Sequence, residues 1–162
     1  MSSGSVYAPE MKWALSFPVI AALCVAAAAC GLPKDSRGTL DQIRAAREIR
    51  VGLVLASPGA PVHPQAAALL RRLSAATGAG PRVFSGDGEP LLARLEEGEL
   101  DLVLGRFTAS TPWSRLVTLS PPLAKAKQGE TEIILAAAME NGENEWIALV
   151  EREARALPGV EQ

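Results

Sequence analysis

The sequence has few of the residues from which metal sites and covalent crosslinks are built. It contains two cysteines and a single histidine. Cys24 lies inside an apolar N-terminal run that we expect to be removed, so Cys30 would be the only thiol of the mature chain. No disulfide or thiolate metal site can then form within one chain. One histidine also excludes a histidine-rich metal centre. We therefore expect neither a metal nor a cofactor.

The chain also lacks a strong charge imbalance and a recognisable catalytic set. Lys and Arg number 16 against 18 Asp and Glu, and the formal net charge is −2. No basic stripe indicates a nucleic-acid partner. The histidine, His63, precedes a predicted helix with Pro64 in its first turn, and no nucleophile motif lies beside it. An acidic cluster straddles a predicted helix end, where we expect a solvated surface: Glu96, Glu97, Glu99 and Asp101. We do not expect an enzyme.

The N-terminus has the layout of a bacterial export signal. Lys12 precedes 17 uncharged residues, Trp13 to Ala29, which end in three alanines before Cys30. A helix of this length reaches only about 25 Å, short of a ~30 Å hydrocarbon core. A cysteine directly after small residues indicates a lipoprotein signal, with Cys30 as the lipidated first residue. An uncleaved anchor and an ordinary cleaved signal are the alternatives, and Met11 is a candidate for the true start.

The remaining chain is long enough for one domain and too short for two ordinary ones. We divide it into a signal peptide at residues 1–29, a polar tether at residues 30–38 and a single lobe at residues 39–158. The predicted location is the cell envelope, with the lobe on the periplasmic or outer side of the cytoplasmic membrane.

Helix and strand signals alternate along this domain. The predicted helices are one capped by Thr39, one from about Val62 to Thr77, one from Pro90 to Glu97 with Asp87 as cap, and a last one capped by Asn141 or Asn144. The predicted strands are Ile49–Ala56, Arg82–Ser85, Asp101–Gly105, Leu116–Ser120 and Glu132–Ala138. Such alternation predicts a three-layer α/β/α sandwich with a mostly parallel sheet. Trp146 is expected in its core.

In open α/β sheets, ligands bind beyond the carboxyl ends of the strands, where backbone N–H groups and helix N-termini converge. Those ends are residues 57–59, 85–88 and 106–110. Their serines, threonine and glycines offer hydroxyl and amide donors to a carboxylate. The alternative is that the segments SPGAP and SGDG are simply turns.

Three segments resemble the first lobe of the type II periplasmic binding proteins, the solute receptors of amino-acid uptake transporters. They are TLDQIRAAREIRVGLVL from Thr39, LLARLEEGELDLVLGRFTAS from Leu91, and EIILAAAMENGENEWIAL from Glu132. The last resembles the place where the family's chain re-enters its first lobe. About a dozen residues precede it, where the family carries a whole second lobe.

The resemblance implies a ligand site after the third strand, where the family has a pattern like G-G-x-T-x-T-x-x-R. From Gly105 this chain reads G-R-F-T-A-S-T-P-W, which keeps one threonine, replaces the second with serine and has tryptophan in place of arginine. Arg115 lies two residues further on and would substitute if the loop is shifted. The predicted ligand-binding residues are Ser57, Ser85, Asp87, Thr108, Ser110, Trp113 and Arg115.

We therefore expect a lipid-anchored, single-lobe substrate-binding-like protein that works with an ABC transporter permease. It would bind a small polar solute, such as an amino acid, only weakly, because one lobe leaves the solute hydrated. A homodimer through the open edge, or docking on a membrane protein, would restore a cleft. The alternative is a non-catalytic protein-interaction module with Phe107, Trp113 and Leu116 as anchors. Since some relatives of these receptors are dehydratases, an enzyme is the third hypothesis, by family analogy alone.

Overall fold

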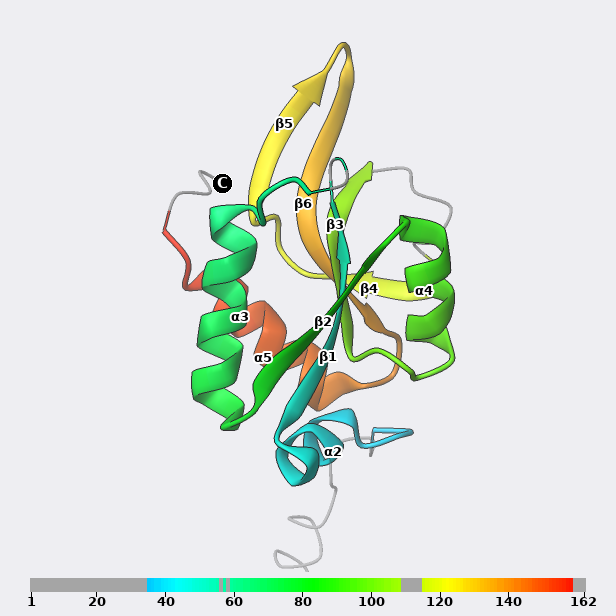
Figure 1. Cartoon of the computed structure of the whole chain (residues 1–162), viewed down its shortest axis with the longest axis vertical. Coiled ribbons are helices and arrows are strands. Elements are labelled where there is room, and N and C mark those ends of the chain that lie inside the picture. The colour runs from blue at the N-terminus through cyan, green and yellow to red at the C-terminus, as the bar shows by residue number, and fades with distance from the viewer. Residues whose placement is uncertain (1–34, 56, 58, 109–114, 159–162) are drawn as a thin grey trace, which may run out of the picture. The chain divides into compact units, whose positions relative to one another are not determined.

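The computed structural model describes residues 35–55, 57, 59–108 and 115–158 (Figure 1). These residues belong to one compact unit, Lys34–Gln162, and Met1–Pro33 is a separate unit. In chain order the elements are α2 (Thr39–Ala46), β1 (Glu48–Val54), α3 (Pro64–Thr77), β2 (Gly80–Gly86), α4 (Gly88–Glu96), β3 (Leu102–Thr108), β4 (Val117–Leu119), β5 (Ala124–Gln128), β6 (Thr131–Glu140) and α5 (Asn144–Arg155).

The strands form a six-stranded sheet in the order β2-β1-β3-β6-β4, with β5 also paired to β6. β1 is parallel to both β2 and β3, whereas β6 is antiparallel to β3, β4 and β5. Five of the six strands therefore run in one direction, and β6 runs against them. Because β6 runs the other way, its last residues lie at the amino-terminal end of the parallel strands.

Helices cover both faces of the sheet, which confirms the predicted α/β/α sandwich. In Figure 1, α3 and α4 lie on opposite sides of the strands, and α5 lies behind α3. One core cluster joins α2, α3 and α5 to the sheet, and its largest fully buried side chain is Trp146. The second cluster packs α4 against β3, β4 and β6 through three leucines, Leu91, Leu92 and Leu95.

Local sequence explains several of these elements. In α3, four apolar residues at helical spacing are buried, and Gly78 ends the helix with a left-handed φ of 71°. The His63 imidazole caps its N-terminus by accepting a hydrogen bond from the Gln65 backbone N–H. In β1, a Cβ at Gly52 would lie 2.9 Å from Cγ2 of Val103. A glycine therefore lets β3 and the segment before it pack close to β1.

Two predicted caps and two predicted exposures are wrong. Gly38, not Thr39, is the N-cap of α2, and Glu143, not Asn141 or Asn144, is the N-cap of α5. Asp101 is buried, so it is not part of a solvated acidic surface. Phe107 is buried too, against α4 and its neighbours, and therefore cannot anchor a partner.

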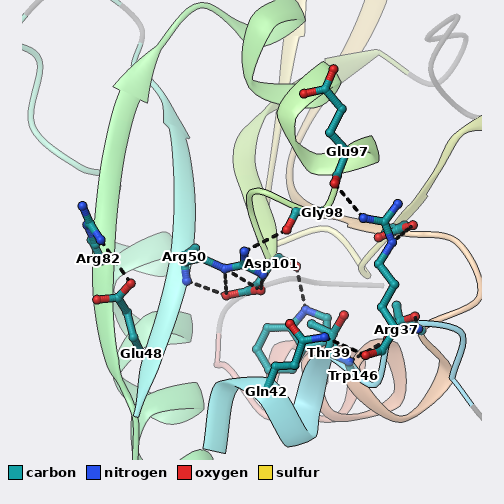
Figure 2. A network of polar contacts seen from close by, with 12 residues as sticks. Arg37, Thr39, Gln42, Glu48, Arg50, Arg82, Glu97, Gly98, Asp101 and Trp146 are labelled. Atoms are coloured by element: carbon teal, nitrogen blue, oxygen red, sulfur yellow. Dashed lines mark hydrogen bonds and ion pairs between the residues drawn. The ribbon is translucent and has the colours of Figure 1, made fainter. Parts of the chain in front are cut away.

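The buried Asp101 joins three elements at the amino-terminal end of the sheet (Figure 2). Its carboxylate accepts hydrogen bonds from the backbone N–H and the guanidinium of Arg50, in β1. Its backbone carbonyl accepts a 2.7 Å bond from Nε1 of Trp146, in α5. The Asp101 N–H in turn donates to the Arg50 carbonyl. The carboxylate, mainly through its hydrogen bond, raises the pKa of Arg50 against the opposing effect of burial.

Glu143 ties the start of the described chain to the same end of the domain. Its fully buried carboxylate accepts bonds from the Ser36 hydroxyl and from the backbone N–H groups of Arg37 and Thr39, at 2.7–2.9 Å. Burial alone would raise the pKa of Glu143, but these bonds outweigh burial and lower it. The last residues of the predicted tether are thus held against the lobe.

We predict that Asp101→Asn lowers the free energy of unfolding by about 3 kcal/mol, because it removes the charge that compensates the Arg50 guanidinium. Urea unfolding of the full chain at neutral pH measures this. The matched control is Glu99→Gln, which breaks an exposed ion pair with Arg94 and should cost less than about 1 kcal/mol. Equal losses in the two variants would contradict the role of Asp101.

A second prediction concerns pH. A lowered pKa means that the Glu143 carboxylate stabilises the fold above the unfolded-state value of about 4.3, and that this contribution is lost as the pH falls below it. Glu143→Gln should therefore have a lower free energy of unfolding at pH 7. Between pH 5 and pH 3 that free energy should fall less than in the unsubstituted protein. The pKa of the nearby Glu140 is raised, by burial against the opposing charge of Arg37, so Glu140→Gln should steepen the same pH dependence. Identical slopes in all three proteins, measured by urea unfolding, would refute this account.

Candidate functional site

Four of the predicted site residues lie at one edge of the sheet, beyond or at the carboxyl ends of β1, β2 and β3. Ser57 is exposed in the loop after β1, and Ser85 is exposed near the end of β2. Asp87 is the exposed N-cap of α4, without a side-chain capping bond. Thr108 is the half-buried last residue of β3, opposite Ile133 of β6. The structure thus brings these four side chains to a common edge, and their ligand role stays a prediction.

The structure does not place Arg115 with them. The backbone carbonyl of Arg115 accepts a 3.1 Å hydrogen bond from Nδ2 of Asn141, the residue after β6. That end of β6 lies at the amino-terminal end of the parallel strands, because Ala138 already pairs with Val103 near the start of β3. The backbone of Arg115 is therefore at the opposite end of the sheet from Thr108. Ser110 and Trp113 lie outside the described residues.

A cavity of about 210 Å³ opens at the carboxyl edge, between the ends of β1 and β3 and the start of α3. Its walls are mostly apolar and come from the two strands, from β6 and from the loop that leads into α3. They comprise Leu53, Val54, Leu55, Pro61, Val62, His63, Pro64, Ala66, Leu104, Arg106 and Leu135. Of the predicted site residues that the structure describes, none is part of the lining.

Arg106 is the charged residue of this lining. It belongs to β3, opposite Leu135 of β6, and its side chain is exposed. No hydrogen bond or ion pair holds its guanidinium to any residue that the structure describes. With respect to the described residues, the guanidinium thus keeps all five N–H donors of its planar fork for an anion from solvent.

Sequence reasoning missed Arg106 as a ligand residue, although a signal for it exists. Side chains alternate along a strand, so Arg106 shares a face with Leu102 and Leu104, which are buried in the core under α3. A charged residue that continues a buried face at the end of a strand is unusual. The alternation in LVLGRFT could thus have pointed to this position before the structure was known.

The His63 side chain serves mainly to start α3. Its Nδ1 accepts a 3.2 Å hydrogen bond from the Gln65 N–H, as expected for a polar residue before Pro64. In a neutral imidazole that accepts at Nδ1, the proton is on Nε2. Within the described part of the chain, no three histidine, cysteine or acidic side chains group into a metal site.

None of the helices within residues 35–158 that the structure describes has the length and apolar character needed to cross a membrane.

Among the solved structures that match this chain are amino-acid-binding proteins and a single domain of one of them. The chain has the fold of one lobe of a type II periplasmic binding protein, as the sequence resemblance implied.

The arginine-bound form of domain 1 from the arginine-binding protein TmArgBP of T. maritima matches with a TM-score of 0.61 and 18% identity. The match covers 72% of this chain and 98% of that one. An amino acid ABC transporter substrate-binding protein from Streptococcus pneumoniae, bound to L-arginine, matches with a TM-score of 0.60 and 9% identity. That match covers 72% of this chain and 90% of the other. The periplasmic VFT2 domain of Bordetella pertussis BvgS matches with a TM-score of 0.57 and 12% identity, over 78% of this chain and 94% of that domain's chain.

No family model matches the chain, and no curated protein matches it either. At these identities the structural matches establish the fold and leave the ligand open.

The two arginines give a sharp prediction for the site. If the cavity binds a carboxylate, Arg106→Gln should abolish any rise in melting temperature that small carboxylates cause. Arg115→Gln should leave that rise intact, because Arg115 lies at the other end of the sheet. Thermal melting of the full chain, purified in non-ionic detergent, measures both variants. Loss of the effect in Arg115→Gln alone would return the site to the loop after β3.

Proposed function

We propose that this chain is a solute-binding lobe that holds a small polar solute weakly at the carboxyl edge of its sheet. The observation that carries this proposal is the cavity of about 210 Å³ with Arg106 in its lining, because no residue that the structure describes pairs with the Arg106 guanidinium. In open α/β folds ligands bind at this edge. A preformed concave site with apolar walls and few polar groups is also the usual form of a small-molecule site.

The comparison with TmArgBP supports the idea that one lobe is enough to bind a solute. Domain 1 of that protein has a structure of its own in an arginine-bound form. In the chain described here the cavity is open to solvent, and Arg106 stays exposed. An exposed ion pair contributes at most about 1 kcal/mol. We therefore expect dissociation constants in the millimolar range, on the order of 4 kcal/mol of binding free energy.

We also propose that the protein is exported, lipid-anchored through Cys30 and a partner of an ABC transporter permease. The apolar run that ends in Ala29 and Cys30 supports export and lipidation. The printed names of two structural neighbours support the setting, since one is an ABC transporter substrate-binding protein and another a periplasmic domain. Because the structural neighbours are binding proteins, we propose that the chain is not an enzyme.

The anchor gives a prediction that does not depend on any solute. Cys30→Ser should move the protein from the membrane fraction to the soluble fraction of the cell, because the lipidated thiol is lost. Immunoblotting of the two fractions measures the change, and Cys24→Ser is the matched control that should leave the distribution as it is. Full membrane retention of Cys30→Ser would count against lipidation at this residue.

The proposed function itself is tested by thermal melting of the full chain against amino acids, small carboxylates and sugars, with the mass in solution recorded alongside. A concentration-dependent rise with one solute class is expected. A melting temperature that no solute changes would overturn solute binding.

A second candidate function is a protein-interaction module built on the same lobe. It is favoured by Leu116, which is 40% exposed beside the start of β4. It is also favoured by the exposed β5 end of the β5–β6 hairpin, which in Figure 1 extends beyond α3 and α4. A stable homodimer that no solute affects would support this alternative.

A further inference from the structure

The walls of the cavity differ from those expected around a free amino acid. The lining is mostly apolar, with Arg106 as the cation, and comprises Leu53 of β1, Leu55 directly after it, Pro61, Val62, Leu104 and Leu135. Val54 of β1 is also part of the lining, but it packs with the cluster under α4 on the other face of the sheet. No aspartate or glutamate is among the described lining residues. Asp87, the predicted site residue with a carboxylate, caps α4, which packs on the other face of the sheet.

Binding in this cavity is therefore unfavourable for the ammonium group of a free amino acid. The carboxylate of the amino acid would contact Arg106 at the mouth, but no described lining residue offers an anionic partner to its ammonium group, which would lose part of its hydration against the apolar walls. Desolvating a charged group without a partner is strongly unfavourable. A ligand that carries a carboxylate and no ammonium group avoids this cost.

We infer that the cavity binds an aliphatic monocarboxylate, with the carboxylate on Arg106 and the hydrocarbon tail between the apolar walls. This inference rests on the proposed function and specifies its substrate class. Arg106 is the residue that orients the ligand, because it provides a bidentate donor at the mouth. The leucines of β1 and β3 and Ala66 of α3 form the apolar surface against the tail.

The size of the cavity limits the length of the tail. A cavity of ~150 Å³ lined by apolar side chains accommodates benzene. By the same scale the volume of about 210 Å³ found here holds roughly eight heavy atoms, and the carboxylate takes three of them, so it is suited to a tail of roughly four to six carbons. Each methylene placed in the cavity should improve affinity about fourfold, until the tail exceeds the available space.

The experiment is isothermal titration of the full chain in non-ionic detergent with straight-chain carboxylates from acetate to octanoate. A matched set of three ligands accompanies it: 4-methylpentanoate, leucine and 3-methylbutylamine. We expect affinity to rise about fourfold per methylene and to level off beyond roughly six carbons. We also expect 4-methylpentanoate to bind at least tenfold more tightly than leucine, and the amine not to bind.

Two variants test the placement of the ligand. Arg106→Gln should weaken the binding of every carboxylate by a similar factor, because it removes the guanidinium that all of them contact. Val62→Phe should narrow the cavity and shorten the preferred chain by one or two carbons, so that octanoate loses more affinity than butanoate. Val83→Phe is the matched control, since Val83 is exposed on β2 and is not part of the lining. The same shortening in Val83→Phe, or none in Val62→Phe, would place the tail elsewhere and overturn the inference.

The remaining outcomes separate the two levels of the proposal. If leucine binds as tightly as 4-methylpentanoate, or affinity does not change with chain length, the monocarboxylate inference is wrong and the solute-binding function stands. The same holds if arginine or a sugar from the wider panel binds and the carboxylates do not. If no solute of either panel binds, the proposed function fails and the inference fails with it.

Discussion

The domain depends on a buried acid at the amino-terminal end of its sheet. Asp101 contacts β1 through the Arg50 backbone and guanidinium, and α5 through the indole of Trp146, while it leads directly into β3. A charge this deeply buried is tolerated because every oxygen has a donor, and the described chain has no buried side-chain polar atom without a partner. One residue, through its carboxylate and its backbone carbonyl, therefore fixes where two parallel strands and the last helix meet.

The stabilising polar groups and the cavity lie at opposite ends of the sheet. The amino-terminal end holds Asp101, Arg50 and Glu143, whose charges are used in internal contacts. The carboxyl end holds the cavity and Arg106, whose charge the described residues leave uncompensated. Such a division lets the site keep an unsatisfied cation, because the fold is held together elsewhere.

Much of the fold could be predicted because the relevant signals are local. The buried leucines of α3 and α4 follow helical spacing, and the apolar runs of β1, β3 and β6 are typical of strands buried on both faces. β5 was not predicted, because its sequence AKAKQ consists of residues that are rare in strands. Its conformation comes from pairing with β6, which no local pattern reveals. The same holds for the caps: the carboxylate of Glu143 accepts a hydrogen bond from the Thr39 N–H, 104 residues earlier in the chain.

At the candidate site, the edge of the sheet was predictable from the strand order. The cavity was not, because it depends on how residues 61–63 before α3 lie against the end of β3.

The turn between β5 and β6 has a consequence for how such a chain can change. Only Gly129 and Glu130 separate the last residue of β5 from the first residue of β6, and those two, Gln128 and Thr131, face each other. Gly129 has a φ of 62°, which suits the tight turn of a two-residue hairpin. Exposed turns with adjacent ends are where whole domains can be spliced into or out of a protein without disturbing the rest. The family resemblance locates the missing second lobe in this part of the chain. The hairpin is thus a point at which the chain can take an insertion without a change in the register of β6 with β3 and β4.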